Sequence, residues 1–476
     1  MRVNQGRALK KMHLIKSLLF VGLIVLAESC STLGSSVKNS DSQKAQRGFN
    51  VKKYVLKNGL TLLISPNPRL PIVSYYTLFD VGGRDEGKGT TGATHFLEHM
   101  MFKGAKKYGP GQFDTRLEKS GGVTNAFTTN DMTVYYQNIP VSFLETMIDM
   151  EADRMQNLLL ETNSFESERK VIFEERKMRY ENSPDGLMFL AVMKKMFAGT
   201  PYGQSVIGDE EDLKALTRDQ MMTFFKNFYV PNNAIVAIAG DVNPDEVIKL
   251  VRKYYEDIPA SKELATIKNK TSDAQMFHSK AELGREYKLY ATNPLPKFSM
   301  AFPGEKLGLK KAYVMDLLAM ILSNGGSSYL MQKYVKSDNP ILNDISLNNF
   351  NLMHSGVFYF SGEVKEGKSV EDVKKTIISD FKDMCENSIN ERSLQKAKNQ
   401  ILAQGYAQLK SNAGVASTIV RNEKWYGDYN FGLKELDIYN GVTQDELRVV
   451  CRETLIADRS IFISTWDKYP KNAESK

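Results

Sequence analysis

The stretch His95-Phe96-Leu97-Glu98-His99 decides how this chain of 476 residues is interpreted. Two histidines four residues apart lie on one face of an α-helix, close enough to share one metal ion. Glu98 follows His95 by three residues and shares that face, so its carboxylate can take a proton from a metal-bound water. The order H-x-x-E-H is the inverse of the H-E-x-x-H order in which helical histidines bind zinc. The alternative is a helix with two surface histidines, but the chain has only 5 histidines, and two of them fall in this pattern.

A hydrolytic zinc site needs a third protein ligand and an open position for water. A helix is predicted to begin at Asn163, with Glu166 three residues later as a capping-box-like pair. One face of this helix combines two acidic and two β-branched residues, at i, i+3, i+4 and i+7: Glu168, Val171, Ile172 and Glu175. The β-branched residues predict that this face is buried, while Glu174 points about 100° away into solvent.

A buried carboxylate needs a partner, because burying an unpaired charge is costly. A zinc ion would satisfy Glu175 and make it the third ligand. The alternative is that Glu168 and Glu175 form ion pairs with arginine or lysine side chains from elsewhere in the chain.

Together these segments resemble the pitrilysin and insulinase-type zinc peptidases, which include the mitochondrial processing peptidase and its bacterial relatives. The resemblance rests on Gly92–Gly104, which contains the H-x-x-E-H pattern, and on Glu175, 76 residues beyond His99. Residues 121–135, 168–175, 201–208 and 229–241 match further signatures of the family. The likeness runs from about Tyr54 to Trp466 and is strongest in the first half.

The resemblance implies a role for each motif residue. His95, His99 and Glu175 take the places of the metal ligands, for one Zn²⁺ per chain, and Glu98 takes the place of the general base. Zinc lowers the pKa of a bound water to about 7, so hydroxide is available near neutrality. Glu98 is then expected to take the proton and to deliver it to the leaving amine.

Three further residues are assigned by the resemblance. Glu168 matches an acidic position close to the active site. Asn125 and Ala126 match positions at which an edge strand receives an extended peptide substrate, by adding it as a further strand. Without the resemblance, Asn125 and Ala126 would be interpreted as ordinary turn residues.

The expected function is that of a secreted zinc metalloendopeptidase that hydrolyses peptides or unfolded polypeptide segments. One alternative is a non-catalytic binding or assembly subunit that keeps the fold, although relatives of that kind usually lose motif residues. Another is a non-proteolytic metal-binding lipoprotein, which would not require Glu98 beside the histidines.

The predicted fold class is α+β, with two duplicated α/β units of the processing-peptidase type, each a mainly antiparallel sheet packed by helices. Asn58-Gly59 between two strand-like runs predicts a hairpin. The other elements expected in the first half are helices over 141–160 and 211–228 and a strand over 234–239. In the second half, strands over 298–302 and 356–362 and helices over 312–322, 370–384 and 393–410 repeat this order without a metal motif.

The chain is divided accordingly. The expected parts are a signal segment (1–29), a flexible tether (30–47), a metal-binding catalytic domain (48–258), a linker rich in lysine, threonine, serine and alanine (259–285) and a metal-free second domain (286–476).

The N-terminal residues predict a targeting segment. Basic residues precede the apolar run Leu18–Ala27, which is too short to span a membrane and is typical of a signal-peptide core. Cys30 resembles a bacterial lipoprotein cleavage site, although Ala27 and Glu28 depart from that pattern. We therefore expect an exported, periplasmic protein with a lipid anchor on Cys30; a plain secretory signal or an uncleaved anchor is the alternative.

The net charge of +7 does not indicate a nucleic-acid partner. The residues before Cys30 include five lysines or arginines and one acidic residue, so the rest of the chain carries only +3. No nucleic acid is expected. Cys385 and Cys451 lie in helix-like apolar contexts and are predicted to be buried free thiols, with a disulfide as the alternative.

The resemblance also implies a protein partner. Members of the family close a chamber from four such units, and this chain supplies two, so we expect a dimer. Active relatives grip the substrate with an arginine and a tyrosine from the second half, but the matching stretch Tyr329–Pro340 has lysine and no arginine. We therefore expect a second, metal-free subunit to supply these residues, with a homodimer as the alternative.

Overall fold

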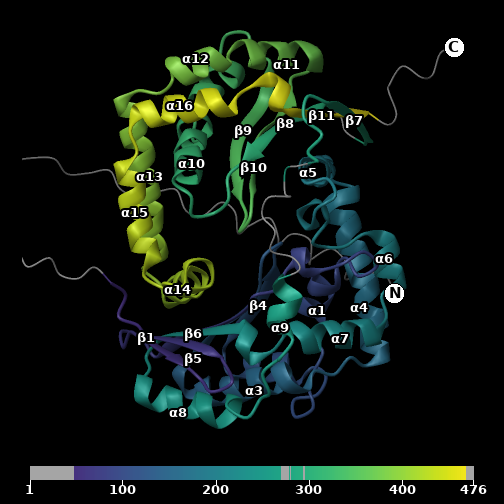
Figure 1. Ribbon diagram of the computed structural model, residues 1–476, viewed down its shortest axis with the longest axis vertical. Helices are drawn as coiled ribbons and strands as arrows, with labels where there is room; N and C mark the ends of the chain where they lie inside the picture. The colour runs from purple at the N-terminus through teal and green to yellow at the C-terminus, as the bar shows by residue number, and fades with distance from the viewer. Residues whose placement is uncertain (1–47, 270–277, 279, 293–294, 468–476) are drawn as a thin grey trace, which may run out of the picture. The chain divides into compact units, whose positions relative to one another are not determined.

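The computed structural model describes residues 48–467, apart from 270–277, 279 and 293–294 (Figure 1). The predicted signal segment, Cys30 and the tether lie outside the described residues. In the described part of the chain, no helix is both long enough and apolar enough to cross a membrane.

A six-stranded sheet forms the first half, in the order β1-β2-β6-β3-β5-β4. The strands are β1 (Lys52–Val55), β2 (Thr61–Pro66), β3 (Ile72–Phe79), β4 (Val123–Thr128), β5 (Thr133–Pro140) and β6 (Ala234–Gly240). Neighbouring strands are antiparallel except β2 and β6. The predicted hairpin is confirmed: Gly59 has φ 87°, a left-handed conformation that glycine adopts without steric cost.

Most helices of the first half share a hydrophobic core with this sheet. The helices of this half are α1 (Ala93–Met100), α2 (Gln112–Lys119), α3 (Leu144–Asn157), α4 (Thr162–Arg176), α5 (Pro184–Met196), α6 (Glu210–Ala215), α7 (Arg218–Phe228) and α8 (Pro244–Tyr255). A π-helical turn, Lys177–Glu181, follows α4 directly.

Two of the predicted helix boundaries in this half are wrong. The single helix predicted over 211–228 is α6 and α7, because Thr217 and Gln220 form a capping box that starts a new helix. The helix predicted to begin at Asn163 begins at Thr162 with Glu161 as its N-cap, and no side chain caps it. The exposed Glu166 instead forms an ion pair with Arg169, whose side chain is largely buried.

A five-stranded sheet forms the second half, in the order β7-β11-β8-β10-β9. Its strands are β7 (Glu286–Ala291), β8 (Lys297–Gly304), β9 (Leu342–Asn351), β10 (Gly356–Val364) and β11 (Ile461–Asp467). The helices are α10 (Lys310–Ser323), α11 (Val370–Ser379), α12 (Phe381–Glu386), α13 (Glu391–Gln408), α14 (Asn412–Tyr426), α15 (Phe431–Gly441) and α16 (Gln444–Thr454). A further helix, α9 (Leu264–Asn269), lies between the two halves in the sequence, and its Leu264 belongs to the hydrophobic core of the first half. Two differences from the sequence prediction stand out: the predicted linker contains α9, and the helix predicted over 370–384 is broken into α11 and α12.

The two sheets repeat one topology, so the predicted fold class is confirmed. In each sheet the single parallel pair, β2 with β6 or β7 with β11, is followed by three antiparallel neighbours. β9 in the second sheet thus corresponds to β4 in the first, and both are edge strands. We retain 48–258 and 286–476 as the proposed domains.

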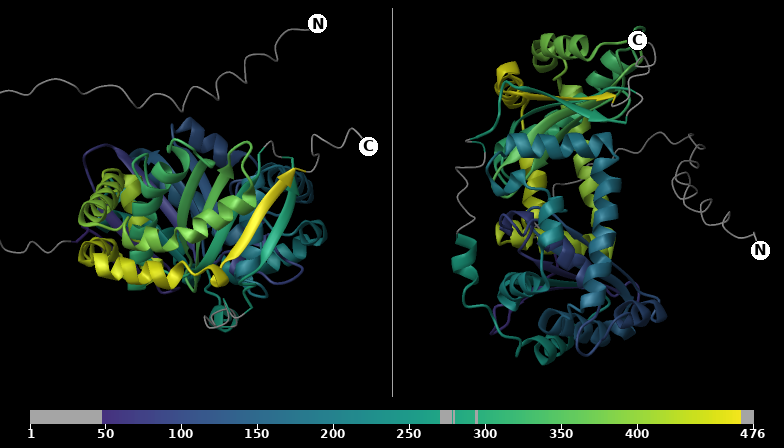
Figure 2. Two further views of the ribbon diagram at one scale, coloured as in Figure 1. Left: turned by 90° about the horizontal axis from the view of Figure 1, so that it is seen from above. Right: turned by 90° about the vertical axis from the view of Figure 1, so that its right-hand side faces the viewer.

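Each sheet is covered in part by a helix from the other half of the chain. α14 packs on the first sheet against β3 and β6 (Figures 1 and 2). Its Ala416, Ile419 and Val420 are fully buried in the cluster formed there. In the reverse direction, α5 packs against β8 and β11 of the second sheet. Because buried apolar surface holds each contact, the two halves are expected to fold as one cooperative unit.

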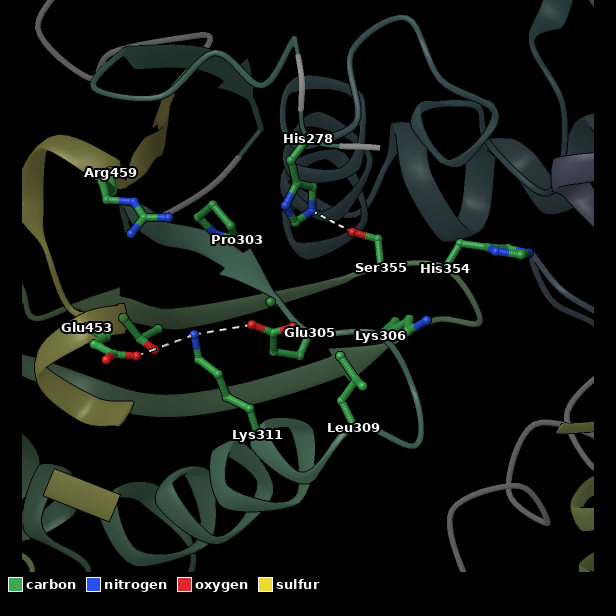
Figure 3. Close-up of a pocket in the computed structure, with 12 residues that line it drawn as sticks. His278, Pro303, Glu305, Lys306, Leu309, Lys311, His354, Ser355, Glu453 and Arg459 are labelled. Atoms are coloured by element: carbon green, nitrogen blue, oxygen red, sulfur yellow. Dashed lines mark hydrogen bonds and ion pairs between the residues drawn. The ribbon is translucent and has the colours of Figure 1, made fainter. Parts of the chain in front are cut away.

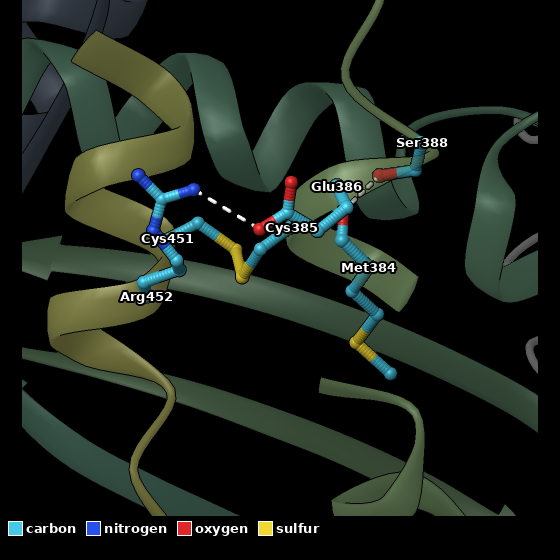
Figure 4. The surroundings of a disulfide bond; sticks show 6 residues. All are labelled: Met384, Cys385, Glu386, Ser388, Cys451 and Arg452. Atoms are coloured by element: carbon cyan, nitrogen blue, oxygen red, sulfur yellow. Dashed lines mark hydrogen bonds and ion pairs between the residues drawn. A yellow bond between two sulfur atoms is a disulfide. The ribbon is translucent and has the colours of Figure 1, made fainter. Parts of the chain in front are cut away.

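A disulfide joins two helices of the second half. The prediction of free thiols is wrong: Cys385 of α12 and Cys451 of α16 are bonded, with their Cα atoms 5.5 Å apart (Figure 4). Both residues are buried, as predicted. The apolar context could not show that residues 66 positions apart face each other.

Removing this disulfide is expected to destabilise the fold by about 4 kcal/mol, because a loop of this length restricts the unfolded chain. The measurement is denaturant unfolding of the double variant Cys385→Ala/Cys451→Ala, in which alanine avoids burying a hydroxyl group. A reductant should lower the wild-type midpoint to that of the variant and leave the variant unchanged. A wild-type midpoint that does not respond to reductant would contradict the bond.

Candidate metal and active site

The H-x-x-E-H stretch forms α1, and the start of this helix is tightly fixed. The N-cap Gly92 has φ 86°, and a Cβ atom there would lie 2.7 Å from the carbonyl oxygen of Ile207, so only glycine fits. The buried Glu86 accepts hydrogen bonds from the N–H groups of Gly92 and Thr94, each at 2.7 Å. These carboxyl oxygens satisfy N–H groups that the first turn of a helix leaves unpaired, while burial raises the pKa of Glu86 to about 8.

The structure brings the three predicted ligands together from two helices. His95 and His99 project from α1 toward Glu175 of α4, and one ligand atom from each residue lies within 4.8 Å of the others. Oε2 of Glu175 is 3.4 Å from Nε2 of His99 and 3.7 Å from Nε2 of His95. A tetrahedral zinc ion with bonds of about 2.0–2.1 Å holds its ligand atoms about 3.4 Å apart. These residues therefore fit zinc in both ligand type and spacing.

Neighbouring charged side chains orient two of these ligands. Nδ1 of His99 lies 3.2 Å from Oε2 of Glu168, an arrangement in which the ring donates to the carboxylate and leaves Nε2 free for a metal. Lys103 in turn contacts Oε1 of Glu168 at 2.7 Å. Arg179, on the π-helical turn, forms an ion pair with Oε1 of Glu175 at 2.9 Å.

The predicted buried face of α4 is only partly correct. Glu168 and Ile172 are buried, and Glu175 is half-buried in the site. The prediction that Val171 is buried is wrong, because this residue is 46% exposed. Glu174 is exposed, as predicted, and pairs with Lys177.

The surroundings of the ligands set their protonation states. Burial, together with the neighbouring His99, lowers the pKa of His95 to about 4, so this ring is neutral near pH 7 as metal binding requires. Burial would raise the pKa of Glu175, but a hydrogen bond from Nε2 of His99, the nitrogen whose proton a metal ion would replace, and the positive charge of Arg179 outweigh it and lower this pKa. Burial raises the pKa of Glu98, and a hydrogen bond from Thr128 opposes this rise.

The predicted substrate-binding residues lie on the free side of a sheet. Among the strands that the structure describes, β4 is an edge strand that pairs only with β5, where Asn125 is opposite Tyr136 and Ala126 is opposite Tyr135. Oδ1 of Asn125 accepts the N–H of Ala126 at 2.8 Å. The edge position matches the prediction; the substrate-binding role of these residues stays a prediction.

Several residues around the site were not found from the sequence. Lys103 lies within the matched stretch Gly92–Gly104, and Thr128 lies within the matched stretch 121–135, but nothing in either pattern indicated a contact with Glu168 or Glu98. Arg179 lies outside the matched segments, four residues after the end of 168–175.

The second half contains a cavity of about 430 Å³ that is separate from these residues (Figure 3). Lys311 lies in it between Glu305 and Glu453, at 3.2 and 3.6 Å, and His278 contacts Ser355 at 2.7 Å. None of the predicted metal or base residues lines it.

Replacing Glu168 with glutamine should weaken zinc binding by about 10- to 100-fold, the usual cost of losing a partner of a ligating histidine. The measurement is a zinc titration against a competing chelator. Glu166→Gln is the matched control on the same helix, because Glu166 is exposed and pairs only with Arg169 among the described residues. Equal zinc affinity of both variants would contradict the proposed role of Glu168.

Comparisons with known proteins place these helices in a family. Residues 62–210 match the family model described as insulinase, peptidase family M16, and residues 215–401 match the model described as the peptidase M16 inactive domain. The chain therefore belongs to peptidase family M16.

Individual relatives agree with this assignment. The chain is 27% identical to the zinc protease PqqE of Helicobacter pylori, over 77% of this chain and 81% of the relative. It is 25% identical to a probable mitochondrial-processing peptidase subunit beta of Arabidopsis thaliana, over 78% of this chain and 70% of the relative. A crystal structure of a protease from Helicobacter pylori superposes with a TM-score of 0.78 at 25% identity, covering 87% of this chain and 99% of that one.

The predicted localisation, an exported lipoprotein held at a membrane, is wrong. The relatives include a mitochondrial-processing peptidase subunit, which is named for another compartment. The N-terminal pattern was already imperfect, with Ala27 at a position where an aliphatic residue is typical and an acidic Glu28 after it.

Proposed function

We propose that this chain is a zinc metallopeptidase that hydrolyses peptides or unfolded polypeptide segments. In this proposal His95, His99 and Glu175 hold one zinc ion and Glu98 is the general base. The observation that carries the proposal is the convergence of two imidazoles and a carboxylate from separate helices, with a further carboxylate on the same helix turn.

The residues divide the chemistry among them. When bound, zinc polarises the scissile carbonyl and lowers the pKa of its water. Glu98 accepts the proton of the attacking water and gives it to the leaving amine. The free edge of β4 at Asn125 and Ala126 binds the substrate backbone, which selects an extended chain and leaves sequence preference to side-chain pockets.

The described geometry favours a peptidase over an assembly subunit. The match to a domain described as inactive covers residues 215–401, whereas His95, Glu98, His99 and Glu175 all lie in the part that matches the insulinase model. A binding subunit would not need a carboxylate beside the histidines. The donor set, the spacing of the ligand atoms and Glu98 therefore support catalysis in the first half.

We also propose that a second, metal-free subunit completes the substrate site. In the stretch Tyr329–Pro340, Lys333 forms ion pairs with Asp380 and Asp383 at 2.8 and 3.2 Å and donates to the hydroxyl of Tyr329 at 2.8 Å. Its charge is thus neutralised inside the second half and is not available to hold a substrate. A peptidase that is fully active as an isolated monomer or homodimer would contradict this proposal.

The test of the main proposal is cleavage of a mixed peptide library by the purified full chain with zinc, both alone and together with the chain that co-purifies with it. We expect one zinc per chain by elemental analysis, and cleavage that a chelator abolishes and added zinc restores. Bound zinc without cleavage, both alone and with the chain that co-purifies, would favour the assembly subunit. Cleavage that chelation does not affect would overturn the proposal.

A further inference from the structure

One side chain of the edge strand holds the carboxylate of Glu98. Oγ1 of Thr128, the last residue of β4, donates a hydrogen bond to Oε2 of Glu98 at 2.5 Å. Among the described residues, no other side chain donates a hydrogen bond to this carboxylate. One oxygen of the Glu98 carboxylate is therefore fixed, and Oε1 is left to accept a proton.

The position of Thr128 is itself well determined. Thr128 pairs with Thr133 of β5 at the end of the ladder. The next residue, Thr129, closes the turn: its N–H donates to the carbonyl oxygen of Met132 at 2.9 Å, and its own carbonyl oxygen accepts the N–H of Gly83 at 3.0 Å.

The turn after Thr128 is also packed closely against the segment that leads to α1. A Cβ atom on Gly82 would lie only 2.5 Å from the backbone of Asn130, so the two segments touch without a side chain between them. A donor held by a sheet and a close-packed turn loses little freedom when it orients a partner, which is the requirement for a preorganised site.

We propose that Thr128 is a positioning residue for Glu98, so that the base and the substrate-binding strand form one rigid unit. The inference rests on the proposed peptidase function. A peptide added along β4 is aligned by the same strand that orients the base, because Thr128 lies two residues from Ala126. Movement of this strand end would then misplace the base and the substrate together.

The inference is tested by comparing wild type with two variants of Thr128. Thr128→Val keeps the shape and the β-branch of the side chain but removes the donor, and Thr128→Ser keeps the donor. We expect Thr128→Val to lower kcat by about 10- to 100-fold, since a misplacement of about 1 Å can cost that much, with KM changed by less than about twofold. Thr128→Ser should stay within about threefold of wild type, and zinc content and the thermal midpoint should be the same in all three proteins.

A second measurement does not depend on activity. The infrared band of the Glu98 carboxylate, obtained as the difference between wild type and Glu98→Gln, should shift in Thr128→Val and not in Thr128→Ser. An unshifted band, or a Thr128→Val protein with wild-type kcat, would overturn the inference. If wild type cleaves no peptide, either alone or with the chain that co-purifies, the proposed function fails, and the infrared band alone decides whether Thr128 holds Glu98.

Discussion

Replacing Glu98 with glutamine is expected to abolish peptide hydrolysis while zinc stays bound. Glutamine has nearly the same size as glutamate and can still accept the hydrogen bond from Thr128, but it cannot take up a proton near neutral pH. General base catalysis contributes about 10²- to 10⁴-fold, so the residual kcat should be at least about 100-fold lower. Zinc affinity should change little, because the converging ligand atoms belong to His95, His99 and Glu175.

The measurement is kcat on a cleaved peptide, together with zinc content of the same sample. Glu174→Gln provides the matched control, because Glu174 is exposed on α4 and its carboxylate pairs with Lys177. It should behave as wild type in both measurements. Retained turnover in Glu98→Gln would show that another group takes the proton and would remove Glu98 from the proposal.

The parts of the site that could be predicted from the sequence depend on local geometry. Two histidines and a glutamate within five residues share a helix face wherever that helix lies, since the helical period alone decides it. The hairpin about Asn58-Gly59 is similarly local, because the turn residues determine it. The assignment of Glu175 as the third ligand could not rest on local geometry, because Glu175 lies on a different helix. The family resemblance supplied the pairing of α1 with α4.

The features that the sequence did not reveal depend on contacts between distant segments. Val171 was expected to be buried from the pattern of α4 alone, but the elements packed on that helix leave it in solvent. Thr128 meets Glu98 only because β4 ends beside α1, and α14 covers the first sheet although it belongs to the second half of the chain. The disulfide likewise depends on how α12 and α16 pack.

Replacing Glu175 with glutamine is expected to remove zinc from the protein altogether. The neutral amide is a weak zinc ligand, and only the two imidazoles would remain of the converging groups. The loss should exceed the roughly 10- to 100-fold expected for Glu168→Gln, because Glu175 would contact the metal itself. Hydrolysis should disappear with the metal.

The predicted loss of zinc from Glu175→Gln can be tested without any substrate, by measuring how zinc changes the thermal midpoint. A ligand at 100 times its Kd stabilises the folded state by about 2.7 kcal/mol, so zinc should raise the thermal midpoint of wild type, of Glu174→Gln and of Glu98→Gln alike. Glu175→Gln should show no such rise at the same zinc concentration. A zinc-induced rise in Glu175→Gln equal to that of wild type would mean that the metal is held elsewhere. We expect Glu98→Gln to keep zinc but lose activity, and Glu175→Gln to lose both. This pair of results would distinguish the role of a general base on α1 from that of a metal ligand on the neighbouring α4.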